Sequence, residues 1–237
     1  MALEARAVDA EVREDTRHEV ELRRLLANRY PDEPELLRSF ASALQRGAQN
    51  EEALAVTERA LGLDPKDPRG HINKARILQA LGKSEAALGS LAEAERIYRS
   101  LGSGVGVARV EGERGHVERA QMHYEAAKRD YGSAEERFRQ AGLAVNAAQA
   151  VSNLADIDLL MGHIADAQSR YQVSLNVSRS AGLFSYLIRD LTNLGAQLYI
   201  QGDLREAEKT LREAVSEGRK CENPALLLPP LINLGSL

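Results

Sequence analysis

Asparagine recurs at a fixed place in this sequence, and its amide is a group that can bind a peptide main chain. Each of four asparagines stands two positions before a small residue: Asn73, Asn153, Asn193 and Asn233. A side-chain amide both donates and accepts hydrogen bonds, so such a column can pair with the backbone of an extended peptide. Inside helices, each asparagine costs up to about 0.7 kcal/mol. The column therefore predicts either ligand binding or a role in capping or bridging neighbouring helices.

Other reactive residues predict no catalytic, metal or cofactor site. His123 and His163 hold the same place in successive repeats and should point outward in parallel, whereas zinc ligands converge on one atom at about 2.1 Å. Cys221 is the single cysteine, with no evident base and only weak support from Lys220 for a lowered pKa. The glycine-rich stretch from Gly102 lacks a preceding strand and a Lys-Ser/Thr ending, so it fails both nucleotide fingerprints. We predict a protein without enzymatic activity.

Composition favours packed helices and argues against several partners. Aromatic residues make up 4% of the 237 residues, there is no tryptophan, and alanine and leucine are abundant. A net charge of −4 gives no global basic field for nucleic acid. No apolar run approaches about 20 residues, and the first fifteen residues lack the apolar core of a secretory signal. A soluble cytoplasmic protein without membrane contact is expected, with carboxylates on exposed helix faces as in REAEKTLRE (205–213).

Several small residues recur in register. A small residue stands two positions after each place of the asparagine column, which has serine or glutamate instead in two repeats. Successive small residues are 34, 40, 40, 40 and 40 residues apart: Ala41, Ala75, Gly115, Ala155, Gly195 and Gly235. Twelve residues later stands an unbroken alanine column: Ala53, Ala87, Ala127, Ala167 and Ala207. Small side chains at both places indicate that two helices cross closely there. Each repeat is therefore predicted to be one helical hairpin that buries its apolar faces only by stacking on its neighbours.

A glycine column marks the turn within each predicted hairpin. Gly82, Gly162 and Gly202 lie between two amphipathic runs, where a helix end favours a left-handed residue. Met122 interrupts this column, so the turn of the third repeat is expected to be less regular. The stretch VARVEGERGHVERAQM (107–122) is also unusually polar for a packed helix.

These columns resemble the tetratricopeptide repeat. In that family a leucine and a small residue lie in the first helix, glycine in the turn, and alanine and an aromatic or leucine in the second helix. The stretch PELLRSFASALQRGAQNEEALAVTERALGLDP resembles the standard 34-residue form, and the later 40-residue repeats are similar to Leu-Gly-Asn-repeat adaptors and to the arrays of bacterial signalling regulators. The resemblance implies an all-α, right-handed superhelical solenoid of antiparallel helix pairs.

The resemblance covers about residues 34–237 and sets the expected divisions. Residues 1–33 are expected to be a helical segment or degenerate leading repeat. The array is expected to divide into repeats at about 34–67, 68–107, 108–147, 148–187 and 188–227, followed by a partial sixth at 228–237. That last segment is apolar, although solenoids normally end in a polar cap. We expect either a fragment of a longer protein or self-association through 228–237.

In the family, first helices line the concave groove and the asparagine often faces it. Carried over by register, the neighbouring groove positions are Arg69, Arg76, Arg109, His116, Arg119, Gln149, Arg189 and Tyr199. This basic set suggests an acidic peptide, a C-terminal carboxylate or a phosphorylated tail. The alternative is that these arginines pair with glutamates on facing helices, such as Glu111, Glu113 and Glu118.

The carboxylate clamp of the chaperone-binding members is matched only in part. Arg38, Asn73 and Arg109 fit three of its five positions, whereas Ser42 and Glu113 do not. Binding to chaperone tails is therefore not expected.

The function expected from the sequence is an adaptor, scaffold or signalling sensor that binds a protein or peptide segment in its groove. The alternative is a structural or regulatory segment of a larger multidomain protein, with mainly intramolecular or self-assembly contacts. No nucleic-acid or membrane partner is expected.

Overall fold

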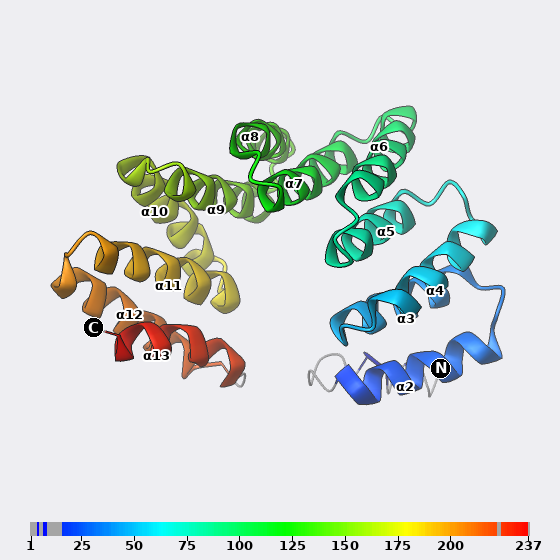
Figure 1. The fold of residues 1–237 in the computed structure, drawn as a ribbon, viewed down its shortest axis with the longest axis horizontal. Coiled ribbons are helices and arrows are strands. Elements are labelled where there is room, and N and C mark those ends of the chain that lie inside the picture. The colour runs from blue at the N-terminus through cyan, green and yellow to red at the C-terminus, as the bar shows by residue number, and fades with distance from the viewer. Residues whose placement is uncertain (1–3, 5–6, 9–15, 222–223, 237) are drawn as a thin grey trace. The chain divides into compact units, whose positions relative to one another are not determined.

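The chain is helical throughout the part that the computed structural model describes, which is residues 4, 7–8, 16–221 and 224–236 (Figure 1). All regular secondary structure in these residues is helical, so the predicted all-α class is confirmed. Among them, no helix combines the length and apolar character needed to cross a membrane. Parts of the expected leading segment 1–33, and Leu237 of the expected partial sixth repeat, lie outside the described residues.

The chain divides into two compact units, residues 1–117 and 118–237, and the division falls inside helix α7. The first unit contains α2 (Thr16–Arg29), α3 (Pro34–Arg46), α4 (Asn50–Leu63), α5 (Pro68–Ala80), α6 (Ser84–Ser100) and most of α7 (Gly104–Ala120). The second contains α8 (Tyr124–Gln140), α9 (Ala144–Leu160), α10 (Ile164–Ser180), α11 (Phe184–Ile200), α12 (Leu204–Gly218), the 3₁₀ turn η1 (Pro224–Leu227) and α13 (Leu228–Gly235).

Antiparallel neighbours pack as hairpins within each unit. The most extensive contacts in the first unit join α5 to α6 and α3 to α4, and those in the second join α11 to α12, α9 to α10 and α8 to α9. All five residues of the alanine column are fully buried. Since a larger side chain there would separate the helix axes beyond the usual 8–10 Å, roughly, this column sets the spacing of the hairpins.

The turns inside the hairpins are alike, although two of them lack glycine and have Ala48 (φ 56°) and Met122 in its place. Gly82, Gly162 and Gly202 have φ of 72°, 80° and 82°, and Met122 takes the same left-handed conformation with φ 62°. The backbone N–H of His123 donates to Glu118 O at 2.9 Å, which repeats the bond of His163 to Asp158 O at 2.8 Å. The expectation of a less regular turn at Met122 was wrong, because the methionine adopts the glycine geometry and accepts its steric cost.

Not every carboxylate lies on an exposed helix face. Asp158 and Asp190 are fully buried, as is Glu19 in the first unit. Asp190 on α11 accepts from Ser152 Oγ of α9 at 2.7 Å and from Ser174 Oγ of α10 at 2.6 Å. Buried charge is tolerated only when such partners replace water. The sequence-based expectation was therefore wrong for these carboxylates, which connect neighbouring helices of the stack.

Candidate functional site

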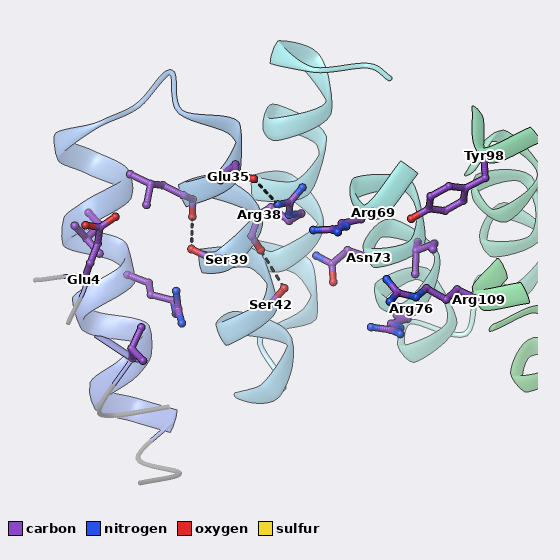
Figure 2. A pocket seen from close by; sticks show the side chains of 15 residues that line it. Glu4, Glu35, Arg38, Ser39, Ser42, Arg69, Asn73, Arg76, Tyr98 and Arg109 are labelled. Carbon is purple, nitrogen blue, oxygen red and sulfur yellow. Dashed lines mark hydrogen bonds and ion pairs between the residues drawn. The ribbon is translucent and has the colours of Figure 1, made fainter. Parts of the chain in front are cut away.

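The first unit contains a cavity of about 540 Å³ that brings together several of the predicted groove residues. Its labelled lining side chains face one common space (Figure 2). The wall consists of Glu4, Val8, Arg23, Leu26, Glu35, Leu36, Arg38, Ser39, Ser42, Arg69, Ile72, Asn73, Arg76, Tyr98 and Arg109. Among the described residues, five arginines against two glutamates line this cavity and give that part of its wall a positive charge, although the whole chain has a net charge of −4.

Three of the five arginines are already neutralised by carboxylates of the chain. Arg23 Nε lies 2.6 Å from Glu19, whose side chain is almost fully buried. Arg38 Nη1 lies 2.5 Å from Asp67 Oδ2. Arg76 pairs with Glu113 on α7. The guanidinium groups of Arg69 and Arg109 are exposed and make no ion pair with the described residues.

The pair of Arg38 and Asp67 supports the start of α5. Asp67 is the N-cap of that helix, and its side chain accepts from the backbone N–H of Arg69 at 2.9 Å. Burial alone would lower the pKa of Arg38, but the hydrogen bond to Asp67 holds that pKa above its ordinary value. Arg38 therefore ties α3 to the cap of α5, which places Arg69 at the cavity.

The pair of Arg76 and Glu113 joins two successive first helices, α5 and α7. The hydrogen bond that Arg76 donates to the Glu113 carboxylate raises the pKa of Arg76. The pair is open to water on the arginine side, since the side chain of Arg76 is 51% exposed, whereas that of Glu113 is only 16% exposed. For Arg76, therefore, the structure agrees with the alternative that the groove arginines pair with glutamates on facing helices.

The asparagine column divides into bonded and unbonded members. Asn73 is buried and its Nδ2 donates to Thr57 Oγ1 at 3.3 Å. Asn193 Nδ2 donates to Asp156 Oδ1 of α9 at 3.1 Å. Asn153 on α9 and Asn233 on α13 are half-buried, and their amides make no hydrogen bond to the residues that the structure describes. Two members thus form hydrogen bonds within the stack, while Asn153 and Asn233 keep their bonding groups available.

Asp156 accepts hydrogen bonds from more than one helix of the second unit. It also accepts from the hydroxyl of Tyr171, and Arg119 Nη1 lies 3.5 Å from its Oδ2. Burial, followed by the charge of Asp156, raises the pKa of Tyr171 above its ordinary value, so that hydroxyl remains a donor. The link between Asn193 and Asp156 spans 37 residues, as does the link between Arg76 and Glu113.

Of the twelve predicted groove residues, Asn73, Arg69, Arg76 and Arg109 lie together in the cavity. His116 belongs to the same unit but does not line it, and its carbonyl accepts from Gln79 Nε2 at 3.1 Å. The other seven lie in the second unit: Arg119, Gln149, Asn153, Arg189, Asn193, Tyr199 and Asn233. Arg189 is engaged there, with Nη2 2.7 Å from Ser152 Oγ and its guanidinium over the Tyr186 ring.

Tyr98 lines the cavity but was missed by the sequence reasoning, because it belongs to the second helix of its hairpin. The sequence feature that could have indicated it is Gly106 on α7. A Cβ at this position would overlap the Tyr98 ring, so the two helices need glycine there. The hydroxyls of Ser39 and Ser42 also face the cavity, and they donate to the carbonyls of Leu36 at 2.8 Å and Arg38 at 3.0 Å.

Asp158, His163 and Asp166 have potential ligand atoms within 4.8 Å of one another. The Asp158 carboxylate already lies 2.6 Å from Lys128 Nζ and 2.7 Å from Arg170 Nε. These two cations neutralise the carboxylate and would repel a metal ion. The group therefore fits an internal ion-pair network better than a metal centre.

No family model matches this chain, and no curated protein matches it either. Solved structures do match. BtubC from P. vanneervenii superposes with a TM-score of 0.68 at 20% identity, over 94% of this chain and 95% of that one. A Rap protein complexed with competence and sporulation factor gives 0.71 at 17% identity, over 98% of this chain and 72% of that one.

The apo form of RapI gives a TM-score of 0.67 at 12% identity, over 88% of this chain, which spans 62% of RapI. At these identities the likeness establishes the fold alone. The chain has the architecture of the tetratricopeptide-like helical-repeat proteins, as the sequence columns predicted.

Proposed function

We propose that the chain is a non-enzymatic protein-interaction module that binds an extended acidic peptide in the cavity of its first unit. The observation that carries this proposal is that two arginines on the wall of one cavity, Arg69 and Arg109, make no ion pair within the described part of the chain. An unpaired guanidinium facing a cavity is a ready partner for a carboxylate or phosphate, which it can hold through two parallel hydrogen bonds.

The rest of the wall suits a peptide better than a small metabolite. Leu36, Ile72 and the Tyr98 ring supply apolar surface between the charged groups. Arg69 and Arg109 hold equivalent places on α5 and α7, one 40-residue repeat apart. An extended segment that crosses the two helices would meet both. Similarity of fold to a Rap protein solved with competence and sporulation factor agrees with this class of function.

The first test is a peptide array of acidic, neutral and basic sequences, probed with the wild type and with an Arg69→Ala, Arg109→Ala double variant. A Lys66→Ala, Arg96→Ala variant is the charge-matched control, since neither residue lines the cavity. We expect the wild type and the control to retain acidic peptides and the cavity variant to lose them. Equal retention by all three, at equal melting temperature, would exclude the cavity as the site.

A second candidate function is suggested by α13. Leu228, Leu231 and Ile232 are 61%, 46% and 59% exposed on this short helix. Such a face suits contacts with another part of a larger protein or with a second copy. The molar mass measured by light scattering across a range of concentrations tests self-association. A mass that rises with concentration in the wild type but not in Leu231→Glu would favour it.

A further inference from the structure

The arginines of the cavity differ in how firmly their internal carboxylates hold them. The side chains of Arg23 and Arg38 are 12% and 23% exposed, and their partners Glu19 and Asp67 each have a further role in the fold. Glu19 also accepts from Arg46 at 2.5 Å, and Asp67 caps α5. Removing either carboxylate would therefore disturb the stack of helices.

Glu113, in contrast, neither caps a helix nor forms a second ion pair within the described residues. Its side chain makes one ion pair within the described residues, and the guanidinium that it holds is half exposed to water. Glu113 does not line the cavity, whereas Arg76 does. The pair therefore withdraws a cavity arginine toward a carboxylate outside the wall. An ion pair whose guanidinium is half exposed to water has a small net stability and is readily exchanged.

The position of Glu113 in the repeat shows that the charge is not needed to join the helices. Glu113 holds the place that asparagine takes in four other repeats. In one of them, Asn193 makes the equivalent 37-residue link, with a neutral amide bonded to Asp156. An amide at position 113 could still accept from Arg76. The carboxylate adds to this link a negative charge next to the arginines of the cavity.

We propose that Glu113 is an internal competitor for the ligand's acidic group: it occupies Arg76 in the free protein and sets how acidic a peptide must be to bind. This inference rests on the proposed function of the cavity. A bound acidic side chain near Arg69 and Arg109 takes over Arg76, and Glu113 turns to water. A peptide with one acidic group gains little from this exchange, whereas one with several gains enough to displace Glu113.

The test uses a fluorescent, N-acetylated and C-amidated hexaglutamate peptide, with hexaglutamine as its neutral counterpart. Binding is followed by fluorescence anisotropy for the wild type, Glu113→Gln and Glu113→Asp. Glu93→Gln is the control, since it adds the same unit of net charge on α6, outside the cavity. Removing the competing charge should tighten hexaglutamate binding about twofold to fivefold, the range expected for one partly exposed charge.

The expected pattern is tighter binding by Glu113→Gln, wild-type binding by Glu113→Asp, and little change for Glu93→Gln or for the neutral peptide. Binding by Glu113→Gln that equals or falls below that of Glu93→Gln, at an unchanged melting temperature, would overturn the inference and leave the proposed function standing. If the wild type and every variant fail to bind hexaglutamate, the proposed acidic-peptide function fails. A folding defect in Glu113→Gln is recognised by its melting temperature, and Glu113→Lys then provides the second variant, with the same expected direction.

Discussion

At the scale of single residues, a left-handed methionine shows where the chain tolerates local strain. Met122 has φ 62°, in a turn whose equivalents are Gly82, Gly162 and Gly202, and its side chain is 72% exposed. A residue with a Cβ in this region costs roughly 1–2 kcal/mol, while glycine costs up to about 1 kcal/mol of additional unfolded-chain entropy. Because little packing would be lost, Met122→Gly should stabilise the protein by about 0.5–1 kcal/mol in urea denaturation.

The control is the reverse change at an equivalent turn. Gly162→Ala, at φ 80°, should destabilise by roughly 1 kcal/mol because alanine there adopts the same strained conformation. A Met122→Gly protein no more stable than the wild type would mean that the methionine side chain makes compensating contacts in the turn.

The asparagine column contains two kinds of residue, and their stability effects should have opposite signs. Asn193→Ala removes a hydrogen bond to the Asp156 carboxylate and should cost about 1 kcal/mol, after the better helix propensity of alanine is included. Asn153→Ala loses no hydrogen bond within the described structure and should gain roughly 0.5 kcal/mol. Urea denaturation of the two variants measures both. Destabilisation by Asn153→Ala would show that its amide also has a structural role.

At the scale of helices, the contact of α6 with α7 depends on one glycine. Gly106→Ala would place a methyl group inside the Tyr98 ring and should destabilise the protein by about 1–3 kcal/mol. It should also turn Tyr98 away from the cavity wall, which would weaken binding of any ligand that contacts the ring.

Gly112 provides a control on the same helix, since a Cβ there meets nothing within 4 Å. Gly112→Ala should stabilise α7 by up to about 1 kcal/mol through helix propensity alone. Thermal melting of the two variants distinguishes close helix packing from a general effect of glycine in α7. Equal shifts would contradict the packing account.

The helices themselves were largely predictable from the sequence, because small residues at crossings and glycine at turns act locally. The alanine column is fully buried as expected, and the turns follow the left-handed geometry. For the ion pairs of the candidate site, the sequence predicted pairing of arginine with glutamates such as Glu113 only as an alternative, and it did not predict which arginine meets which glutamate. Arg76 meets Glu113 across 37 residues, three fewer than the repeat, and this offset depends on how one first helix leans over the next. Repeat length alone does not determine that angle.

At the scale of the whole molecule, the net charge is negative, whereas the described residues around the cavity carry a positive charge. The chain carries a net charge of −4, whereas the described residues that line the cavity include five arginines and two glutamates. The pairs of Arg23, Arg38 and Arg76 reduce this local excess, and it is concentrated on Arg69 and Arg109. Specific attraction of an acidic ligand therefore depends on charges close to it, and the net charge acts against its approach.

The salt dependence of binding distinguishes the attraction of an acidic ligand by the cavity arginines from its repulsion by the net negative charge. The Debye length is about 10 Å at 0.1 M salt, so distant negative charges are largely screened, while arginines in contact with the ligand are screened less. Raising NaCl from about 50 to about 300 mM should therefore weaken hexaglutamate binding several-fold, because the contacts at Arg69 and Arg109 are partly exposed and lose strength with salt. The Arg69→Ala, Arg109→Ala variant should show little of this dependence. Binding that strengthens with salt would mean that net repulsion dominates and that the cavity does not attract acidic peptides.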